Sequence, residues 1–304
     1  MLSIGFSLPW RQLKHGLEVC RLSVRIIVFS LNNIFCFVRN PVLRLQKLPK
    51  CSQPTKTNSN SWMKQLFILL SFVVLFLGCE KQKTGSLIDQ RDGHDYLTVK
   101  IGDQWWMAEN LAYMPFVSKL HLNGGIWVYG YNGDSHEYAK GLIEYRNLGC
   151  LYNWTTAMDI SDEYDEKLWG GSDSLHQGVC PAGWHLPSDS EWKMLEQNLE
   201  SDPDFEASDD RQYTGDVGLK IKSDSGWAAN GNGSNETGFG ALPGGIRYRT
   251  GFYLNQGSYG YYWTATEQYP GSATYRYLRD SSKGTFRGFP HKANGLSIRC
   301  LKDN

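Results

Sequence analysis

A twelve-residue apolar run, residues 66–77, follows a start at Met63-Lys64 and ends at Gly78-Cys79. The run is shorter than the ~20 residues that a membrane-spanning helix needs. A small residue before a cysteine is typical of a bacterial lipoprotein signal, although Phe76 departs from the usual leucine. We therefore expect residues 63–78 to be a signal peptide that is removed, and Cys79 to carry a lipid. A plain transmembrane anchor is the alternative. This processing restricts the folded part of the protein to the residues after Cys79.

Residues 1–62 contain nine Lys/Arg and one acid, Glu18, without a sustained helical or strand period. We expect them to be an over-extended gene start, or else an unusual leader. After residue 78 the balance reverses, because 21 Lys/Arg stand against 30 Asp/Glu and give a net charge near −9. Such a charge disfavours nucleic acid as a partner. We expect the protein to be held in the cell envelope by its lipid, at the outer membrane of a Gram-negative bacterium.

The residues beyond Cys79 predict an α+β domain. A polar tether is expected over residues 79–90, then a β-hairpin of residues 96–101 and 104–107 around the turn Gly102-Asp103. Residues 113–147 are expected to be mostly loop with short strands. Ser188 and Glu191 form a capping-box pattern before a helical apolar spacing, which predicts one main amphipathic helix. Residues 154–160 are a candidate for a second helix. A late antiparallel sheet is expected from four aromatic strand candidates: 260–266, 274–279, 284–289 and 296–301.

Several sequence blocks occur in an order that resembles one known family. They read KIGDQWWMAENL (100–111), LYNW (151–154), CPAGWHLPS (180–188), GFGALPGGIR (238–247), YWTAT (262–266) and SIRC (297–300). Together with DGHDY (92–96), this set is similar to the Fibrobacter succinogenes major paralogous domain, and it assigns residues 91–302 to that domain. The resemblance implies an exported, often lipid-anchored bacterial protein. The block around His185-Leu186-Pro187 is also distantly similar to formylglycine-generating proteins, which implies a loop-rich, C-type-lectin-like fold.

The cysteines after Cys79 are Cys150, Cys180 and Cys300. The resemblance implies that Cys180 and Cys300 form the long-range disulfide of lectin-like folds, in an oxidising compartment, with Cys150 left free. The alternative is that all three are buried thiols.

No catalytic constellation emerges from the sequence. His185 is flanked by Trp184 and Leu186, which is typical of a packed histidine, and no nucleophile elbow or phosphate-binding glycine loop is found. Two acidic stretches, 159–166 and 202–210, lack the calcium-loop pattern, so solvated loops are the simpler interpretation. We therefore expect no enzyme activity, no cofactor and no metal site.

Three classes of function remain open: a binding module for a surface glycan or a protein, a structural or assembly component of the cell surface, and, third, an enzyme. The supply of aromatic side chains favours the binding module, because Trp and Tyr rings stack on sugars and anchor interfaces. We expect the ligand-binding aromatic residues to lie in loops outside the matched blocks; these are Trp127, Tyr129, Tyr131 and Trp169.

Overall fold

The expected hairpin is present in the computed structural model, which describes residues 82–119, 124–201 and 215–304. Strands β2 (Asp95–Ile101) and β3 (Gln104–Met107) pair antiparallel from Thr98 opposite Met107 to Ile101 opposite Gln104. Gly102 in the turn has φ +58°, and a Cβ there would collide with the Asn198 side chain. The positive φ therefore favours glycine at this turn, and a Cβ would in addition displace the Asn198 side chain. Residues 1–62, the expected signal peptide and Cys79 lie outside the described residues.

This hairpin belongs to a five-stranded sheet of order β1-β2-β3-β12-β6. Its other strands are β1 (Thr84–Ile88), β6 (Trp184–His185) and β12 (Leu301–Lys302). The expectation that residues 79–90 form only a tether is wrong for residues 84–88, which pair with residues 95–99. The sequence of residues 84–88 has no alternation of apolar and polar residues that would predict a strand, because β1 is an edge strand with almost every side chain exposed.

The expected late antiparallel sheet is formed by β9 (Tyr259–Tyr269), β10 (Ser272–Arg279) and β11 (Phe286–Gly288), in the order β11-β10-β9. The strand expected over residues 296–301 is mostly absent, since β12 begins at residue 301. Two short pairs complete the strands: β4 (Ile126–Trp127) with β5 (Leu151–Tyr152), and β7 (Ile246–Arg247) with β8 (Tyr253–Leu254).

The main helix, α5 (Asp189–Leu199), has the expected capping box, in which Ser188 and Glu191 each bond the other's backbone N–H. Helix α4 (Trp154–Met158) confirms the second expected helix. Three further helices were not predicted: α2 (His136–Gly141), α3 (Ile143–Leu148) and α6 (Val217–Ile221). A 3-10 turn covers Asp162–Asp165. Helices α2 and α3 bury one side chain and none, respectively, so no apolar periodicity could mark them in the sequence.

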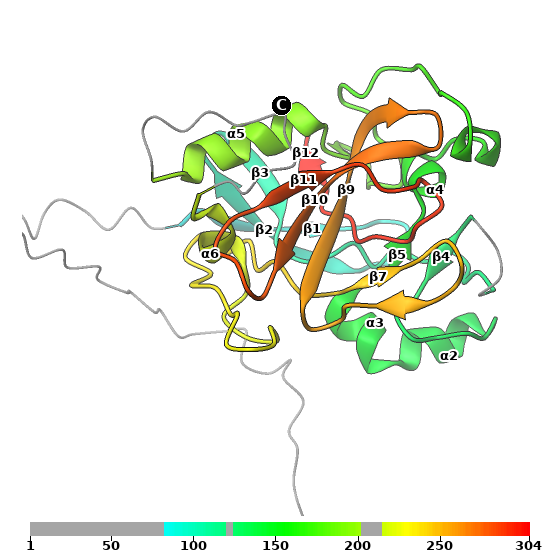
Figure 1. Cartoon of the computed structure of the whole chain (residues 1–304), viewed down its shortest axis with the longest axis horizontal. Helices are drawn as coiled ribbons and strands as arrows, with labels where there is room; N and C mark the ends of the chain where they lie inside the picture. The colour runs from blue at the N-terminus through cyan, green and yellow to red at the C-terminus, as the bar shows by residue number, and fades with distance from the viewer. Residues whose placement is uncertain (1–81, 120–123, 202–214) are drawn as a thin grey trace, which may run out of the picture. The chain divides into compact units, whose positions relative to one another are not determined.

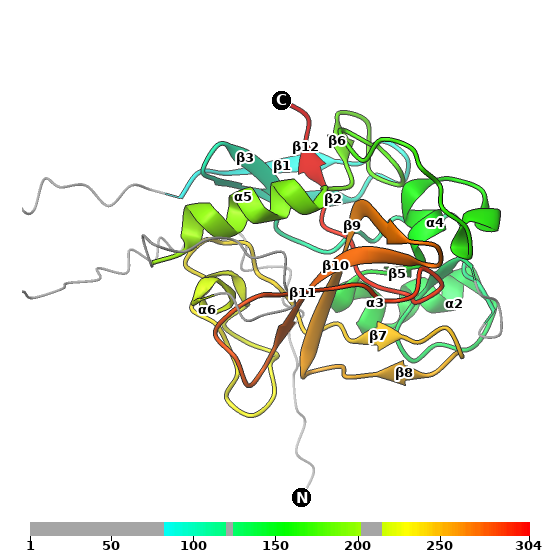
Figure 2. The same ribbon diagram turned by 45° about the horizontal axis from the view of Figure 1, so that its top comes forward.

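Figure 1 shows β9 and β10 at the middle of the domain, with α5 on one side and the β7–β8 hairpin on the other; Figure 2 agrees. Two hydrophobic clusters form the core, one around Trp154 and Trp263 and the other around Trp106 and Trp192. The architecture is α+β, with several antiparallel sheets and few, short helices.

The predicted covalent bond is present as well. Cys180 and Cys300 form a disulfide across 120 residues of sequence, which ties the segment before α5 to the last strand. Cys150 is a buried free thiol, as expected. Within the residues covered by the structure, no helix is long and apolar enough to cross a membrane.

Candidate binding surface

Trp127 does not lie in an exposed loop, and the expectation that it does is wrong. It belongs to β4, opposite Leu151, and its side chain is 0% exposed. The guanidinium of Arg247 covers its ring at 3.9 Å from the ring centre. Strand pairing and this cation–π contact place Trp127 in the core, where its ring has no face for a ligand.

Tyr129 and Tyr131 are half-buried and lie in one group with two further tyrosines. The ring of Tyr129 is 5.1 Å from that of Tyr253, and the ring of Tyr131 is stacked 5.6 Å from that of Tyr138. The hydroxyl of Tyr253 donates to the backbone carbonyl of Tyr131 at 2.8 Å. We call these four tyrosines the hairpin cluster, because Tyr253 belongs to β8. Tyr138, from α2, is 62% exposed.

Trp169 is also half-buried, but its contacts are different. Its ring packs edge-on against Trp154 and His176 at 6.3 and 5.0 Å, and its backbone N–H donates to Glu267. None of these residues belongs to the hairpin cluster. The structure thus brings together two of the four predicted residues, Tyr129 and Tyr131.

A second group of aromatic rings lies on the β9-β10-β11 sheet. In the register of the sheet Tyr277 stands opposite both Tyr261 and Phe286. Parallel rings stack along this face: Tyr259 on Tyr261 at 5.5 Å, Tyr275 on Tyr277 at 5.3 Å, and Tyr277 on Phe286 at 4.9 Å. We call these five residues the strand cluster.

Sequence reasoning missed the strand cluster, although the signal was present. Tyr259, Tyr261 and Trp263 alternate with other residues, as do Tyr275 and Tyr277. Alternation with period two places side chains on one face of a strand. The ligand-binding residues were expected in loops, whereas these residues lie in or beside the expected strands 260–266 and 274–279; of them, only Trp263 lies inside a family block and was assigned to the core. Trp263 is fully buried, and Tyr261 and Phe286 are buried as well, at 8% and 6% exposed. Tyr259, Tyr275 and Tyr277 are only partly buried.

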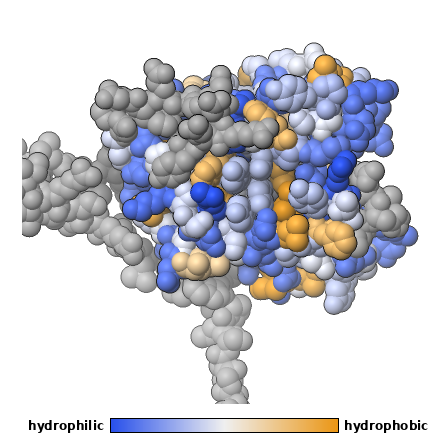
Figure 3. Space-filling view, in the orientation of Figure 1, coloured by the Kyte–Doolittle hydropathy of each residue, from blue (hydrophilic) through white to orange (hydrophobic). Residues whose placement is uncertain are grey.

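The two clusters are joined through Gly245 and Asn255. The backbone N–H of Gly245 donates to the carbonyl of Tyr259, and a Cβ on Gly245 would lie 2.7 Å from the ring of Tyr129. Asn255 donates from its side chain to the hydroxyl of Tyr261 at 2.8 Å. The hairpin and strand clusters together are called the tyrosine face below. On the side of the domain where β9 and β10 lie, Figure 3 shows orange, apolar residues among pale and blue ones. Tyrosine falls on the hydrophilic half of this scale, so the orange colour does not mark the tyrosine face.

Two hydroxyls of the tyrosine face are uncharged at neutral pH. Burial raises the pKa of Tyr253 to about 12, and burial also raises the pKa of Tyr261 well above its ordinary value. Both hydroxyls therefore stay protonated. Tyr253 already donates its proton to the carbonyl of Tyr131, whereas Tyr261 accepts from Asn255 and can donate its own proton. Flat rings with neutral hydroxyls at their edges are suited to a polar, uncharged ligand with apolar C–H faces.

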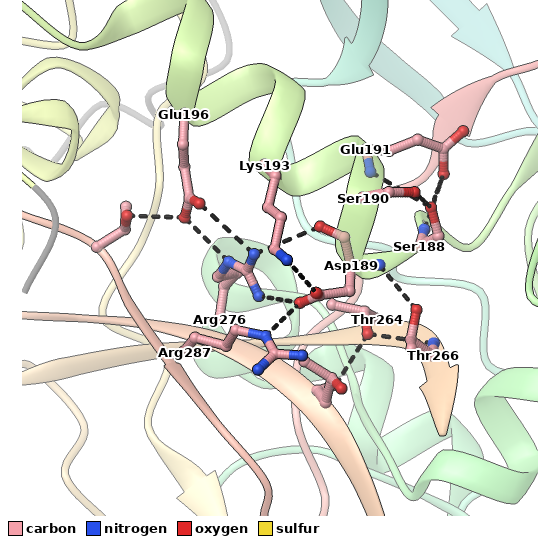
Figure 4. A network of polar contacts seen from close by, with 12 residues as sticks. Ser188, Asp189, Ser190, Glu191, Lys193, Glu196, Thr264, Thr266, Arg276 and Arg287 are labelled. Atoms are coloured by element: carbon pink, nitrogen blue, oxygen red, sulfur yellow. Dashed lines mark hydrogen bonds and ion pairs between the residues drawn. The ribbon is translucent and has the colours of Figure 1, made fainter. Parts of the chain in front are cut away.

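A group of five charged side chains lies elsewhere, between α5 and the late sheet (Figure 4). Arg276 contacts Asp189 at 2.5 Å and Glu196 at 2.9 Å, and Arg287 contacts Asp189 at 2.8 Å. Lys193 lies 3.5 Å from the same Asp189 carboxylate. These ion pairs run from α5 to β10 and β11, so the network holds the helix against the late sheet. Where side chains are described, no group of three or more His, Cys, Asp or Glu is arranged to hold a metal ion.

Comparison with known proteins gives the family. The sequence model of the Fibrobacter succinogenes major domain (Fib_succ_major) matches residues 99–302, about two thirds of the chain. The chain belongs to this family. No curated protein and no solved structure matches the chain. The Fibrobacter succinogenes major domain contains both clusters of the tyrosine face, whereas β1 precedes the matched region.

Proposed function

We propose that this protein is an exported, lipid-anchored cell-envelope protein whose Fibrobacter succinogenes major domain is a non-enzymatic glycan-binding module, with the tyrosine face as its binding surface. The observation that carries the proposal is the stack of parallel tyrosine rings on the β9-β10-β11 sheet. The hairpin cluster is linked to this sheet through the backbone of Gly245 and the side chain of Asn255. Of the four residues expected to bind the ligand, Tyr129 and Tyr131 belong to this surface, whereas Trp127 and Trp169 do not.

The chemistry of a sugar fits such a surface in two ways. The C–H groups on one side of a pyranose ring pack against aromatic rings, and its hydroxyls exchange hydrogen bonds with tyrosine hydroxyls. Tyrosine loses little rotamer freedom on binding, because it has two side-chain torsions. The stacking in the strand cluster restricts the rings further, so that less entropy is lost when a ligand binds.

Cellular location is part of the proposal. The lipoprotein signal of residues 63–78 and the lipid on Cys79 would place the domain in the cell envelope, at the outer membrane of a Gram-negative bacterium. The Cys180–Cys300 disulfide supports an oxidising compartment outside the cytoplasm, since such bonds are rare where thiols are kept reduced.

We also propose that the α+β domain is a variant of the C-type-lectin-like fold. Three features support this: a long-range disulfide between the middle and the end of the domain, one main helix, and a late antiparallel sheet. Sugar binding in this proposal does not follow from the fold, because one fold can carry many functions. It rests on the tyrosine face.

Glycan-array screening of the purified protein, with and without calcium, tests the proposed function. Saturable binding to a glycan should be lost in Tyr259→Ala and weakened in Tyr259→Phe, which keeps the ring but removes the hydroxyl. Tyr269→Ala is the matched control, because Tyr269 is 56% exposed at the far end of the same strand and packs on Phe289. Thermal unfolding of each variant verifies that the fold is retained.

Other outcomes would contradict the proposal. Binding that survives Tyr259→Ala unchanged would exclude the strand cluster as the site. No glycan binding, with a specific envelope protein recovered instead, would indicate the alternative role in structure or assembly. Reproducible turnover of a substrate would overturn the non-enzymatic assignment.

A further inference from the structure

The folded domain begins very close to the proposed lipid anchor. Gln82 is already held to β2, because its side-chain amide donates to the carbonyl of Lys100 at 2.6 Å. The carbonyl of Lys83 accepts from the Lys100 backbone N–H at 2.9 Å, and β1 starts at the next residue. Between Cys79 and Gln82 the chain has only two residues. These three Cα–Cα steps span at most about 11 Å, however they are arranged.

This reach is small compared with the domain. A globular domain of this length has a radius of gyration of about 17 Å, so its opposite end lies much farther from Gln82 than the linker can reach. A lipid on Cys79 therefore does not let the domain turn freely above the bilayer. If Cys79 carries the lipid, Gln82 has to lie within about 11 Å of it, close to the bilayer surface.

The residues around Gln82 define the end of the domain that we call the anchor end. Lys83 and Lys100 lie beside Gln82, and the Lys100 ammonium is 3.2 Å from Asp103 in the β2–β3 turn. The same turn contacts Asn198 near the end of α5. In Figures 1 and 2 the cyan start of β1 lies at one end of the domain, and α2 and β4 lie toward the other.

We propose that the anchor end of this domain docks on the headgroup surface of a lipid bilayer, with α2 and the hairpin cluster turned away from it. This inference rests on the lipidation of Cys79 in the proposed function. The short linker supports docking, and the charge of the anchor end does not. The lysines there are accompanied by the acidic Asp103, so the anchor end is not a purely basic surface. The orientation also leaves Tyr138 of α2, and with it the hairpin cluster, accessible from outside the membrane.

Two exposed acidic residues provide matched reporter positions. The side chain of Asp103 at the anchor end is fully exposed, and that of Glu137 on α2 is 89% exposed. Asp103→Cys and Glu137→Cys can each be labelled with a fluorophore. The native cysteines of the domain do not compete, since Cys150 is buried and Cys180 and Cys300 are bonded to each other.

The experiment uses the full-length gene product, isolated from membranes and placed in phosphatidylethanolamine vesicles that contain a nitroxide-headgroup lipid as quencher. We expect a large loss of fluorescence at position 103 and little loss at position 137. A Gly/Ser insertion of about 20 residues after Glu80, with a root-mean-square reach of about 25 Å, should remove the difference between the two positions.

The outcomes separate this inference from the proposed function. A lipidated N-terminus with equal quenching at the two positions would overturn the docking and leave the anchor in place. The docking would also be overturned if the ratio of quenching at position 103 to quenching at position 137 were the same with and without the Gly/Ser insertion, because linker length would then have no effect. Mass spectrometry that finds no lipid on Cys79 would overturn the anchor and, with it, the docking.

Discussion

Arg276 on β10 is fully buried, and its guanidinium lies 2.5 Å from the carboxylate of Asp189 at the start of α5. Burial by itself lowers the pKa of Arg276, but the neighbouring Glu196 and Asp189 carboxylates raise it by more. The pKa of Asp189 moves the other way: burial raises it, and the charges of Arg276 and Arg287 lower it further than that. The fold thus keeps both partners charged away from water and joins α5 to the late sheet.

Arg276→Met should destabilise the protein by about 3–5 kcal/mol, because it leaves Asp189 and Glu196 buried without their main cation. Urea unfolding measures the change in the free energy of unfolding. The control is Lys100→Met, which removes the exposed pair with Asp103 and should cost less than about 1 kcal/mol. Similar losses in the two variants would contradict the importance of burial in this network.

His185 lies between two carboxylates. Its Nδ1 is 2.7 Å from Asp303 and its Nε2 is 3.0 Å from Glu191. Burial lowers the pKa of His185, but the hydrogen bonds to Glu191 and Asp303 more than offset this, so that the pKa is raised above its ordinary value. The imidazolium form can donate to both carboxylates at once.

The stability of the domain should therefore fall as the pH rises through the folded-state pKa of His185. A group whose pKa is higher in the folded than in the unfolded protein stabilises the fold. This stabilisation is complete below the unfolded pKa, which is about 6.5 for histidine. In urea unfolding at several pH values, the advantage of the wild type over His185→Gln should be greatest below that value and shrink above it. An advantage that grows above pH 6.5 would contradict the double ion pair, as would an NMR titration that places the His185 pKa below about 6.5.

Features of this fold that are encoded by neighbouring residues could be predicted from the sequence, and features that depend on distant residues could not. The capping box of Ser188 and the Gly102 turn are encoded by neighbouring residues, and both were predicted correctly. Strand β1 was missed because it owes its structure to pairing with β2 and carries no pattern of its own. Trp127 was misplaced because its burial depends on Arg247, 120 residues later in the chain.

The candidate surface was predictable only in part for a similar reason. Tyr129 and Tyr131 were chosen because they lie in a glycine-rich segment outside the family blocks, and they do join the tyrosine face. Predicting the strand cluster would have required the register between β9 and β10, which brings Tyr261 and Tyr277 opposite each other. A sequence gives the alternation within each strand but not the pairing between two strands.

Loss of the disulfide should destabilise the domain strongly. Cys180 and Cys300 close a loop of 120 residues, for which the chain-entropy model gives about 4–5 kcal/mol as an upper value. Cys180→Ser, or reduction of the wild type, should lower the free energy of unfolding by up to this amount, and the two changes should lower the thermal midpoint by similar numbers of degrees. Cys150→Ala is the control, and its midpoint should remain as sensitive to reductant as that of the wild type. Peptide mapping that links Cys150 to another cysteine would contradict the assignment.

Trp127 should matter for stability rather than for binding. Its ring is fully buried under Arg247, and its indole N–H donates to the carbonyl of Lys119 at 3.3 Å. Trp127→Ala should therefore cost about 3–5 kcal/mol of unfolding free energy, measured in urea, because it leaves a cavity and uncovers the guanidinium. Trp127→Phe keeps much of the ring and should cost less.

Tyr259→Ala should show the opposite behaviour, with a small loss of stability and loss of glycan binding, because its ring is only partly buried. If Trp127→Ala instead kept its stability and lost the glycan, the ligand would bind at β4, and the tyrosine face would not be the site.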